Sequence, residues 1–389
     1  MLPATEAVKL RPSVTGALTV ECIDSSWGFT ALRPEWNALL RDSVSDCPFL
    51  TWEWLHTWWT HLSGSSQLRI AAVRAGKELV ALAPFRITKS RVAFLSRLDM
   101  LGTGEAGSDY LDVIVRRGWE TEAIHALASF ARSQNLTLRL PHLAPTATAC
   151  DLADQLAADG WTASTATDGV CPYIPLAGHT WDSYLGTLGS SHRANVRRRI
   201  KALGQKFSMR VERVTTEAQR SEALAALVTF HERRYVGRGG STAFMTSALR
   251  AFHDEVTRRA LDRGWLRLFV LRVDHALVAV MYGFMYNGRF YFYQHGFDGQ
   301  YQQHSVGLIV MGLSIRAAID EGADEFDMLW GVEPYKWLWA RETRELRKIH
   351  LFPPHLGGRI HLGASRARRS LGTLARRVRT ITKRETHGA

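Results

Sequence analysis

Two segments of this 389-residue chain repeat one another, and this repeat limits what the chain can fold into. Apolar and polar residues alternate on both sides of Gly76-Lys77 in the segment 68–87, and around Asp274-His275 in the segment 266–285. Such alternation about a short turn predicts a β-hairpin in each segment. The segments align without a gap at an offset of 198 residues. The matching residues are Leu68, Arg69, Arg74, Leu79, Val80 and Ala81, which align with Leu266, Arg267, Arg272, Leu277, Val278 and Ala279.

The residues after each hairpin repeat the same order of elements. A helical pattern over 122–134 leads into an apolar strand at 136–140, and a second over 307–321 leads into a strand at 325–329. A hairpin, a helix and a parallel strand that occur twice predict a duplicated α+β unit, each with a central mixed β-sheet flanked by helices. Gly, Pro and Cys punctuate the chain near 169–179, which predicts domains at 1–175 and 176–358.

Three further helices are predicted from local patterns. The segment 191–205 is strongly basic, and a second helix candidate covers 216–236. The tryptophans at 52, 54, 58 and 59 predict a helix that faces the core; a ligand-binding aromatic cluster is the alternative.

Composition indicates a soluble cytosolic protein. Hydrophobic residues make up 46% and charged residues 22%, and no apolar run reaches the roughly 18 to 20 residues that span a bilayer. The N-terminus lacks the apolar stretch of a signal peptide. Cys22, Cys47, Cys150 and Cys171 are scattered without C-x-x-C spacing, so we expect reduced thiols and no metal site.

The net charge of +12 is concentrated at the C-terminal end. Residues 359–389 hold nine Lys or Arg and one acid, a net +8, and 12 minus 8 leaves +4 for the rest. Leu371, Leu374, Val378 and Ile381 recur at helical spacing among these cations. This pattern predicts a basic amphipathic tail that binds an anionic membrane or an anionic nucleotide, with a solvated charge run as the alternative. Nucleic acid is not expected, because no recognition motif accompanies the charge.

Three stretches resemble the acyltransferases of the GNAT superfamily, and within it the double-domain FemAB/CelD-like branch. The first is the segment 190–198, similar to the branch's S-x-x-R-x-x-x-R-R helix. The second is 291–308, an aromatic strand followed by a small-x-Gly helix start, and the third is 326–336, similar to its F-D-x-x-x-G-x-x-x-Y-K block. The resemblance covers about residues 20 to 352 and is looser before Pro175. It implies tandem duplicated GNAT-like domains.

The resemblance implies transfer of an acyl group, usually from acyl-CoA, to an amine or hydroxyl. The branch is associated with exopolysaccharide synthesis or with the addition of amino acids to cell-wall precursors. The expected co-substrate is acetyl-CoA, with no permanently bound cofactor, and the expected acceptor is a saccharide or lipid-linked saccharide. Its donor site falls on His304, Ser305, Val306 and Gly307, although the segment 303–307 keeps only part of the superfamily's phosphate loop. A helix start binds pyrophosphate through free N–H groups; the alternative is that Ser305 is a simple N-cap.

The third stretch also contains the groups that acyl transfer requires. A base must deprotonate the acceptor, and an acid must protonate the leaving thiolate. The catalytic candidates are Asp327, Glu333, Tyr335, Lys336 and His295, and the acceptor-binding candidates are Arg193 and Gly331. A strand-end turn with a surface Glu–Lys pair, and a hydrogen-bonded His295, are the alternatives. The other arginines near Arg193 are expected to form a solvated face.

Two other functions remain open. One is a FemAB-like transferase that uses aminoacyl-tRNA, although the sequence has no sustained heptads for the coiled-coil arm common in such proteins. The other is a non-catalytic module of a polysaccharide-synthesis complex that senses an anionic ligand. We expect a cytosolic location, with a peripheral position on the inner face of the membrane if the tail binds lipid.

Overall fold

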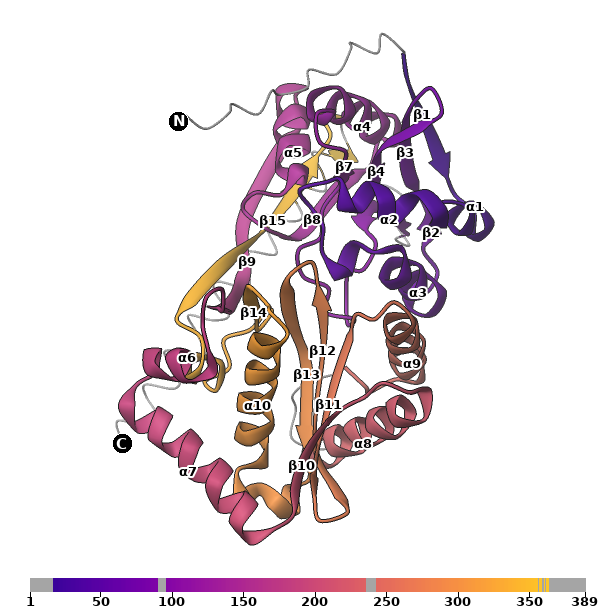
Figure 1. The fold of residues 1–389 in the computed structure, drawn as a ribbon. Helices are drawn as coiled ribbons and strands as arrows, with labels where there is room; N and C mark the ends of the chain where they lie inside the picture. Colours follow the sequence, from indigo (N-terminus) through magenta and orange to yellow (C-terminus); the bar gives the residue numbers. More distant parts are fainter. Residues whose placement is uncertain are drawn as a thin grey trace, which may run out of the picture.

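The structure is a computed structural model that describes residues 17–89, 96–235, 243–355, 357–358, 360 and 362–363. The chain forms two lobes, one above the other in Figure 1. We call the segment from β1 to α5 the first half and the segment from α6 to β14 the second half. Most of the predicted basic tail, 359–389, lies outside the described residues.

The first half contains short strands and five helices within the described residues. Its elements are β1 (Leu18–Ile23), α1 (Ser26–Ala31), α2 (Arg33–Arg41), the 3₁₀ helix η1 (Pro48–Leu50), α3 (Trp52–Leu62), β2 (Gln67–Leu68), β3 (Ile70–Ala75), β4 (Glu78–Ala83), β5 (Phe85–Thr88), β6 (Arg97–Met100), β7 (Ile114–Val115), α4 (Glu120–Gln134), β8 (Thr137–Leu143) and α5 (Thr148–Ala158).

The second half follows a long strand, β9 (Thr162–Pro175). Its elements are α6 (Trp181–Thr187), α7 (Ser190–Lys206), β10 (Met209–Arg213), α8 (Glu217–Tyr235), α9 (Ser247–Asp262), β11 (Leu266–Val273), β12 (Ala276–Tyr286), β13 (Arg289–Phe297), η3 (Gly299–His304), α10 (Val306–Asp320) and β14 (Glu325–Asp327). After β14 come η4 (Lys336–Leu338) and the strand β15 (Glu342–Phe352).

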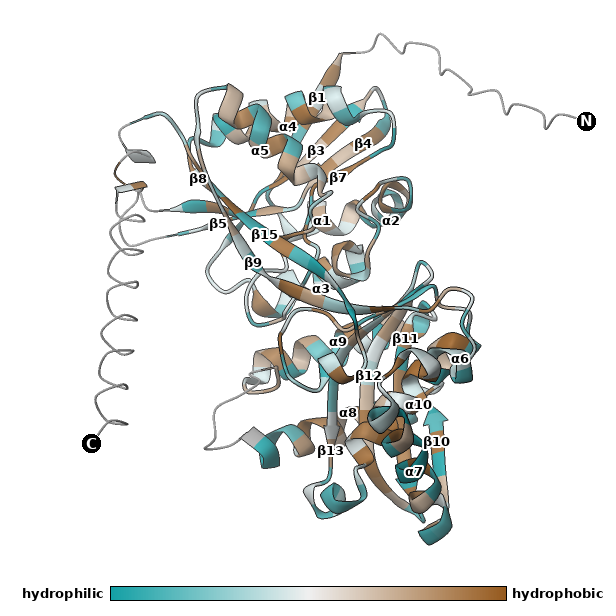
Figure 2. Cartoon of the chain, turned by 90° about the vertical axis from the view of Figure 1, so that its left-hand side faces the viewer, coloured by the Kyte–Doolittle hydropathy of each residue, from teal (hydrophilic) through white to brown (hydrophobic). Residues whose placement is uncertain are grey.

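The two halves share one large sheet. Its eleven strands run in the order β10-β11-β12-β13-β14-β9-β15-β8-β6-β5-β2, and a four-stranded sheet, β1-β3-β4-β7, belongs to the first half alone. Figure 2 shows β9 and β15 running side by side from one lobe to the other. β9 passes without a break through Gly169, within the predicted boundary region, so neighbouring strands of one sheet connect the two lobes.

Strand pairing confirms the repeat. Arg74 lies opposite Leu79 in the first hairpin, and Arg272 lies opposite Leu277 in the second. A register shift stands directly before the arginine in both hairpins, at positions that differ by the same 198 residues. A β-bulge is a local feature that one extra residue creates, so a shared bulge at a shared position is a strong mark of duplication. The parallel strand after each helix is also confirmed, as β6 with β8 and as β13 with β14.

The bulge arginines make equivalent ion pairs. Arg74 binds Glu35 of α2 at 2.8 Å, and Arg272 binds Glu222 of α8 at 2.7 Å. In each half the arginine therefore fastens the hairpin to the earlier of the last two α-helices before it, α2 or α8. The sequence match at this position reflects a repeated contact as well as a repeated strand.

The halves differ in one strand. In the second half, β13 continues from Phe292 to Gly296 with three residues between them. The equivalent residues of the first half, Met100 and Ile114, pair with β5 and β4 at matching positions, but thirteen residues, 101–113, separate them. We call these thirteen residues the inserted loop, and they reach the second half.

Helix α3 joins the halves through an aromatic and charged interface with α9. Trp54 is 2% exposed and packs edge-to-face on Phe252 at 5.1 Å, while Arg263 donates to the carboxylate of buried Glu53 at 2.8 Å. Trp52 and Trp58 are also buried, which confirms that the tryptophan-rich helix faces the core. None of the helices among the described residues is long and apolar enough to cross a membrane.

Candidate functional site

The candidate site lies where β13 and β14 separate. β14 pairs in parallel with the first three residues of β13 along its whole length, from Arg289 with Glu325 to Tyr291 with Asp327, and β13 then continues beyond it. Beyond Tyr291 the chain after β14 occupies the place next to β13. The ring of Tyr335 lies 5.2 Å from that of His295 and 6.4 Å from that of Phe292. The structure therefore brings His295 and Tyr335 together at this separation of the strands, which we call the splay.

A sharp turn ends β14. The carboxylate of Asp327 accepts a hydrogen bond from the backbone N–H of Leu329 at 2.8 Å, and Leu329 has a φ of 56°, which non-glycine residues seldom adopt. Gly331 has a φ of 131°, and an added Cβ there would overlap the carboxylate of Glu333. Gly331 is thus required by the backbone, and the structure places it in the turn rather than against the splay residues.

Asp327 faces away from the splay. Its neighbour Phe326 stacks on Phe290 at 4.5 Å in the core of the second half, and alternation along the strand turns Asp327 to the opposite side. There its carboxylate accepts hydrogen bonds from the hydroxyl of Tyr110 at 2.6 Å and from Arg344 at 3.1 Å. Burial raises the pKa of Asp327 to about 6, against the opposing effect of these two donors. The structure therefore separates Asp327 from His295 and Tyr335.

Lys336 is an internal cation. It is 3% exposed, and its Nζ donates to the carbonyl oxygens of Leu329 at 3.1 Å and Trp330 at 2.8 Å. It also forms an ion pair of 3.1 Å with Glu333, whose side chain is half exposed. Two of its N–H donors are therefore used by backbone carbonyls and its charge is balanced by Glu333, so these contacts of the ammonium group lie within the turn. Its contacts make Lys336 the group that holds the turn closed.

His295 is neutral at ordinary pH. Burial lowers its pKa to about 3, and the nearby charges of Arg234, His231 and Lys336 act in the same direction. Its backbone carbonyl accepts a hydrogen bond from Nε2 of His231 at 3.2 Å. A neutral imidazole has one ring nitrogen that can accept a hydrogen bond, and here its ring lies beside that of Tyr335.

The predicted donor residues form the entrance to α10. Ser305 has a φ of 58° and makes no capping hydrogen bond with its side chain, so it is not the simple N-cap of the alternative interpretation. Gly307 lies against the ring of Phe297: a Cβ added to Gly307 would stand 3.0 Å from that ring. The ring of His304 packs on Phe207 at 5.2 Å. The four residues His304 to Gly307 are contiguous at this helix start, and the first turn of α10 holds no acid.

Arginine 193 lies away from this helix start, and another arginine of α7 approaches it. Arg193 donates to the carbonyl of Gly186 at 3.2 Å, before α7 begins. Arg199, expected on a solvated face, instead donates to the carbonyl of Gln303 in η3 at 3.3 Å. That expectation was wrong for Arg199, because α7 packs along α10 and its later turns reach the entrance of that helix. The contact of Arg199 with the start of α10 depends on the packing of α7 along α10, which no local sequence pattern indicates.

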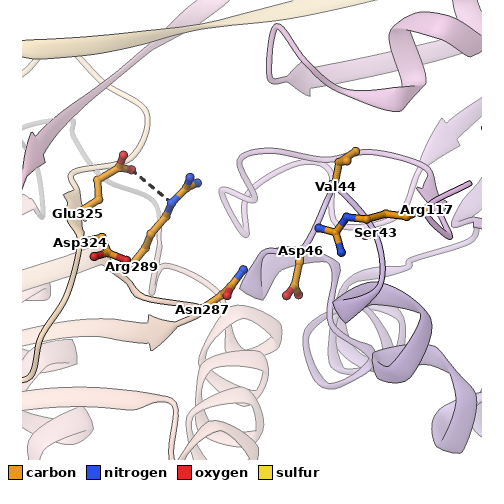
Figure 3. A pocket seen from close by; sticks show the side chains of 8 residues that line it. All are labelled: Ser43, Val44, Asp46, Arg117, Asn287, Arg289, Asp324 and Glu325. Carbon is orange, nitrogen blue, oxygen red and sulfur yellow. Dashed lines mark ion pairs between the residues drawn. The ribbon is translucent and has the colours of Figure 1, made fainter. Parts of the chain in front are cut away.

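A polar pocket of about 290 Å³ opens between the halves, as Figure 3 shows. It contains none of the predicted site residues and is lined by Ser43, Val44, Asp46, Arg117, Asn287, Arg289, Asp324 and Glu325. Arg289 stands at the first residue of β13, and His295 comes six residues later, about 20 Å along an extended strand. The pocket is therefore separate from the splay. Among the described residues, no group of His, Cys, Asp or Glu is arranged to hold a metal ion.

Comparisons with known proteins agree with this geometry. Residues 190–337, which contain β10 to β14 and the splay, match the family model of an acetyltransferase (GNAT) domain. None of the curated proteins matches the chain in sequence.

Solved structures match the whole arrangement of two halves. FemX superposes with a TM-score of 0.59 at 11% identity, over 82% of this chain and 95% of FemX. L-PGS from Bacillus licheniformis gives a TM-score of 0.52 at 11% identity, over 86% of this chain and 95% of that one. A conserved protein of unknown function from Bacteroides thetaiotaomicron gives 0.56 at 12% identity, over 86% and 99%. The chain is thus an α+β protein of two tandem GNAT-like units with the fold of FemX, and its second unit matches the acetyltransferase domain.

Proposed function

We propose that the second half transfers an acyl group from acyl-CoA, with acetyl-CoA as the expected donor, to an amine or hydroxyl of a saccharide. The phosphates of the donor bind at the start of α10, and its thioester reaches the splay beside His295 and Tyr335. The acceptor is a sugar of an exopolysaccharide or of its lipid-linked precursor, and the reaction takes place on the cytosolic side, where acyl-CoA is made.

The observation that carries this proposal is a difference between two equivalent helix starts. Helices α4 and α10 both have fifteen residues and follow equivalent strands. The connection before α4 has four residues, 116–119. In it the backbone N–H of Gly118 donates a hydrogen bond of 2.8 Å to the carboxylate of Glu120. Glu120 and Glu122 add two negative charges to that first turn. A helix start that binds its own carboxylate and carries two acids repels an anion.

The start of α10 has the opposite character. Its connection has eight residues, 298–305, and the described first turn has neither an acid nor a capping side chain. Arg199 adds a guanidinium group, which donates to Gln303 and whose buried Nε has no partner among the described residues. Free N–H groups, the helix dipole and an arginine together suit a pyrophosphate. Of two equivalent helix starts, only the one in the second half is suited to a phosphate-bearing donor.

The splay supplies groups for the chemical step. The acceptor's amine or hydroxyl attacks the thioester carbonyl and loses its proton, and the departing thiolate takes one up. His295, which is neutral, accepts the first proton, and the hydroxyl of Tyr335 gives the second. We assign no nucleophilic intermediate, because direct attack within a ternary complex needs only these two groups.

Binding of the donor tests the proposal directly. We would titrate acetyl-CoA into the full-length protein by calorimetry and compare Arg199→Ala with Arg198→Ala. Arg198 is the adjacent residue of α7 and, among the described residues, bonds only within that helix, to Asn195 at 2.9 Å, so it is a matched control. Arg199→Ala should weaken binding by about tenfold, the equivalent of one charge-assisted contact, and Arg198→Ala should not.

A second variant copies the first half's helix start into the second. Leu308 is the third residue of α10, as Glu122 is the third residue of α4. Leu308→Glu should abolish binding of acetyl-CoA while unchanged circular dichroism shows that the fold persists. Equal affinity in Leu308→Glu, Arg199→Ala and the wild type would rule out the donor site. Mass analysis of the secreted polysaccharide from cells with and without the protein then tests the acceptor.

An aminoacyl-tRNA donor is the second candidate. Helix α7 carries exposed Arg197 and Arg198 directly before Arg199, the arginine that reaches the start of α10. A polyanion larger than coenzyme A would contact both of them. Retention of charged tRNA without binding of acetyl-CoA would favour this candidate. Ligand binding without any transfer would favour the sensing module.

A further inference from the structure

The segment between β14 and β15 has an inverted polarity. Its lysine, Lys336, is 3% exposed, whereas four of its apolar side chains face solvent. The exposed fractions are 67% for Val332, 52% for Trp330, 43% for Leu338 and 39% for Trp337. We call these four residues the apolar rim. Exposed apolar area is unfavourable in water by roughly 25 cal/mol per Å², so a rim of four such side chains indicates a surface that meets an apolar partner.

Internal contacts hold the rim in place. Lys336, the residue directly before Trp337, donates to the carbonyls of Leu329 and Trp330 and so ties the two ends of the rim together. On the other side Trp339 is buried: the hydroxyl of Tyr184 donates to its carbonyl at 3.1 Å, and its ring lies 4.8 Å from that of His192. The rim residues are thus exposed because their neighbours are fastened inward, not because the segment lacks structure.

A cation fixed beside the rim favours an anionic surface. Glu333 and Lys336 neutralise each other, so the residues from Met328 to Ala340 have no net charge. Arg341 follows directly, is exposed, and donates to the carbonyl of Trp337, which fixes its guanidinium group beside the rim; exposed Glu342 comes next and begins β15. Tryptophan and arginine together are typical of the boundary between lipid headgroups and acyl chains. An apolar rim beside a fixed guanidinium matches a bilayer with anionic lipids more closely than it matches water or a neutral protein surface.

We infer that the apolar rim docks the protein on the surface of an anionic bilayer, with its side chains at the level of the headgroups. The inference stands apart from acyl transfer, because docking requires neither a donor nor an acceptor. Tyr335 lies two residues before Trp337 of the rim, so docking brings this end of the splay close to the membrane surface. The rim is an attachment separate from the basic tail predicted at 359–389.

A fluorescent probe at two positions tests this inference. Full-length variants carry a single environment-sensitive NBD label at Val332→Cys or at Trp27→Cys, with exposed Cys22 and half-buried Cys150 replaced by serine. Trp27 is 81% exposed on α1, on the opposite side of Figure 1 from α6, and serves as the matched control. With vesicles of phosphatidylglycerol and phosphatidylcholine, emission should rise and shift to the blue at position 332 and stay unchanged at position 27. Protein that sediments with vesicles while the label at 332 stays unchanged would overturn the inference.

Sedimentation at high salt separates the rim from the tail. Salt screens the attraction of exposed cations and leaves apolar insertion in place. In 0.5 M salt the double variant Trp337→Ser/Leu338→Ser should lose about tenfold in binding to the vesicles, and Trp27→Ser should equal the wild type. Equal binding of the two variants would contradict the inference. So would a concentration-dependent dimer in light scattering that the double variant abolishes, because a second copy of the chain would then be the partner of the rim.

Discussion

The hydroxyl of Tyr110, in the inserted loop of the first half, donates a hydrogen bond of 2.6 Å to the buried carboxylate of Asp327 in the second half. Tyr110 holds a φ of 57°, a conformation that costs a tyrosine about 1 kcal/mol or more. The same loop accepts a second bond, because the hydroxyl of Tyr293 donates to the carbonyl of Ala106. The inserted loop therefore fastens the first half to the two strands that form the splay.

We expect the bond between Tyr110 and Asp327 to couple the stability of the two halves. Tyr110→Phe leaves a buried carboxylate with one donor fewer and should lower the free energy of unfolding by about 1–3 kcal/mol. Urea unfolding of Tyr110→Phe, Asp327→Asn and the double variant gives their interaction energy. Additive effects in this cycle would mean that the bond contributes nothing to stability.

A neighbouring acid predicts a pH dependence. Asp109 accepts a hydrogen bond from the N–H of Trp330 at 2.8 Å, and burial raises its pKa from the ordinary 3.8 to about 7. The folded protein holds this proton more tightly than the unfolded chain, so the stabilisation is complete below about pH 4 and is lost as pH rises through 7.

Asp109→Asn removes this titration and should equal the wild type near pH 4. Near pH 8 the variant should be the more stable by at least about 1 kcal/mol, because it buries no charge. Urea unfolding at both pH values measures the difference. A constant difference between the two proteins across this range would show that Asp109 does not titrate as its burial indicates.

Lys336 and Lys348 allow the loss of a buried lysine to be compared with the loss of an exposed one. Lys336 is buried and bonds two carbonyls, whereas Lys348 is 41% exposed and binds Asp168 at 2.8 Å. Lys336→Ala should lower stability by about 1–3 kcal/mol and abolish transfer through loss of the turn, while the rest of the protein stays folded. Lys348→Ala should cost less than about 1 kcal/mol. Thermal unfolding and transfer assays of both variants check this, and full activity in folded Lys336→Ala would remove the turn from the mechanism.

The pKa of His295 makes a prediction about the rate profile. With a pKa near 3, the imidazole is neutral throughout the working range, so it contributes no acid limb between pH 5 and 9. His295→Gln should lower kcat about 100-fold and leave the affinity for acetyl-CoA unchanged. A limb near pH 6 to 7 that disappears in His295→Gln would show that this group titrates during turnover.

The tail remains a prediction from sequence. A chain that ends at Gly358 should lose salt-sensitive sedimentation with anionic vesicles, since each basic residue near lipid contributes about 1 kcal/mol at low salt. It should keep acetyl-CoA binding, because Arg199 and the start of α10 are untouched. If the two chains sediment alike at low salt, the nine basic residues of the tail are not an anchor.

Local pattern was enough to predict the repeat and most helix positions. The hairpins and the helices at α4 and α10 follow from periodicity, which depends on residues close in sequence. The sequence could also predict the splay, because His295 stands near the end of β13 and Tyr335 follows β14, the next strand along the chain. The orientation of Asp327 was not, because its partner Tyr110 is 217 residues away and belongs to a loop without a counterpart in the second half. Arg344 likewise reaches Asp327 only because β15 returns between the lobes.

The place of β15 in the sheet has a consequence for synthesis. This strand is the last one among the described residues, yet it pairs with both β8 and β9, which end by residue 175. At about 5–20 residues per second, the roughly 200 residues from the end of β8 to the start of β15 take roughly 10–40 s to make. During that interval β8 and β9 present unpaired strand edges on the ribosome, the kind of surface that invites aggregation. Neither lobe can be completed before residue 352 has emerged, so we expect the nascent chain, rather than the finished protein, to be the form that most depends on chaperones.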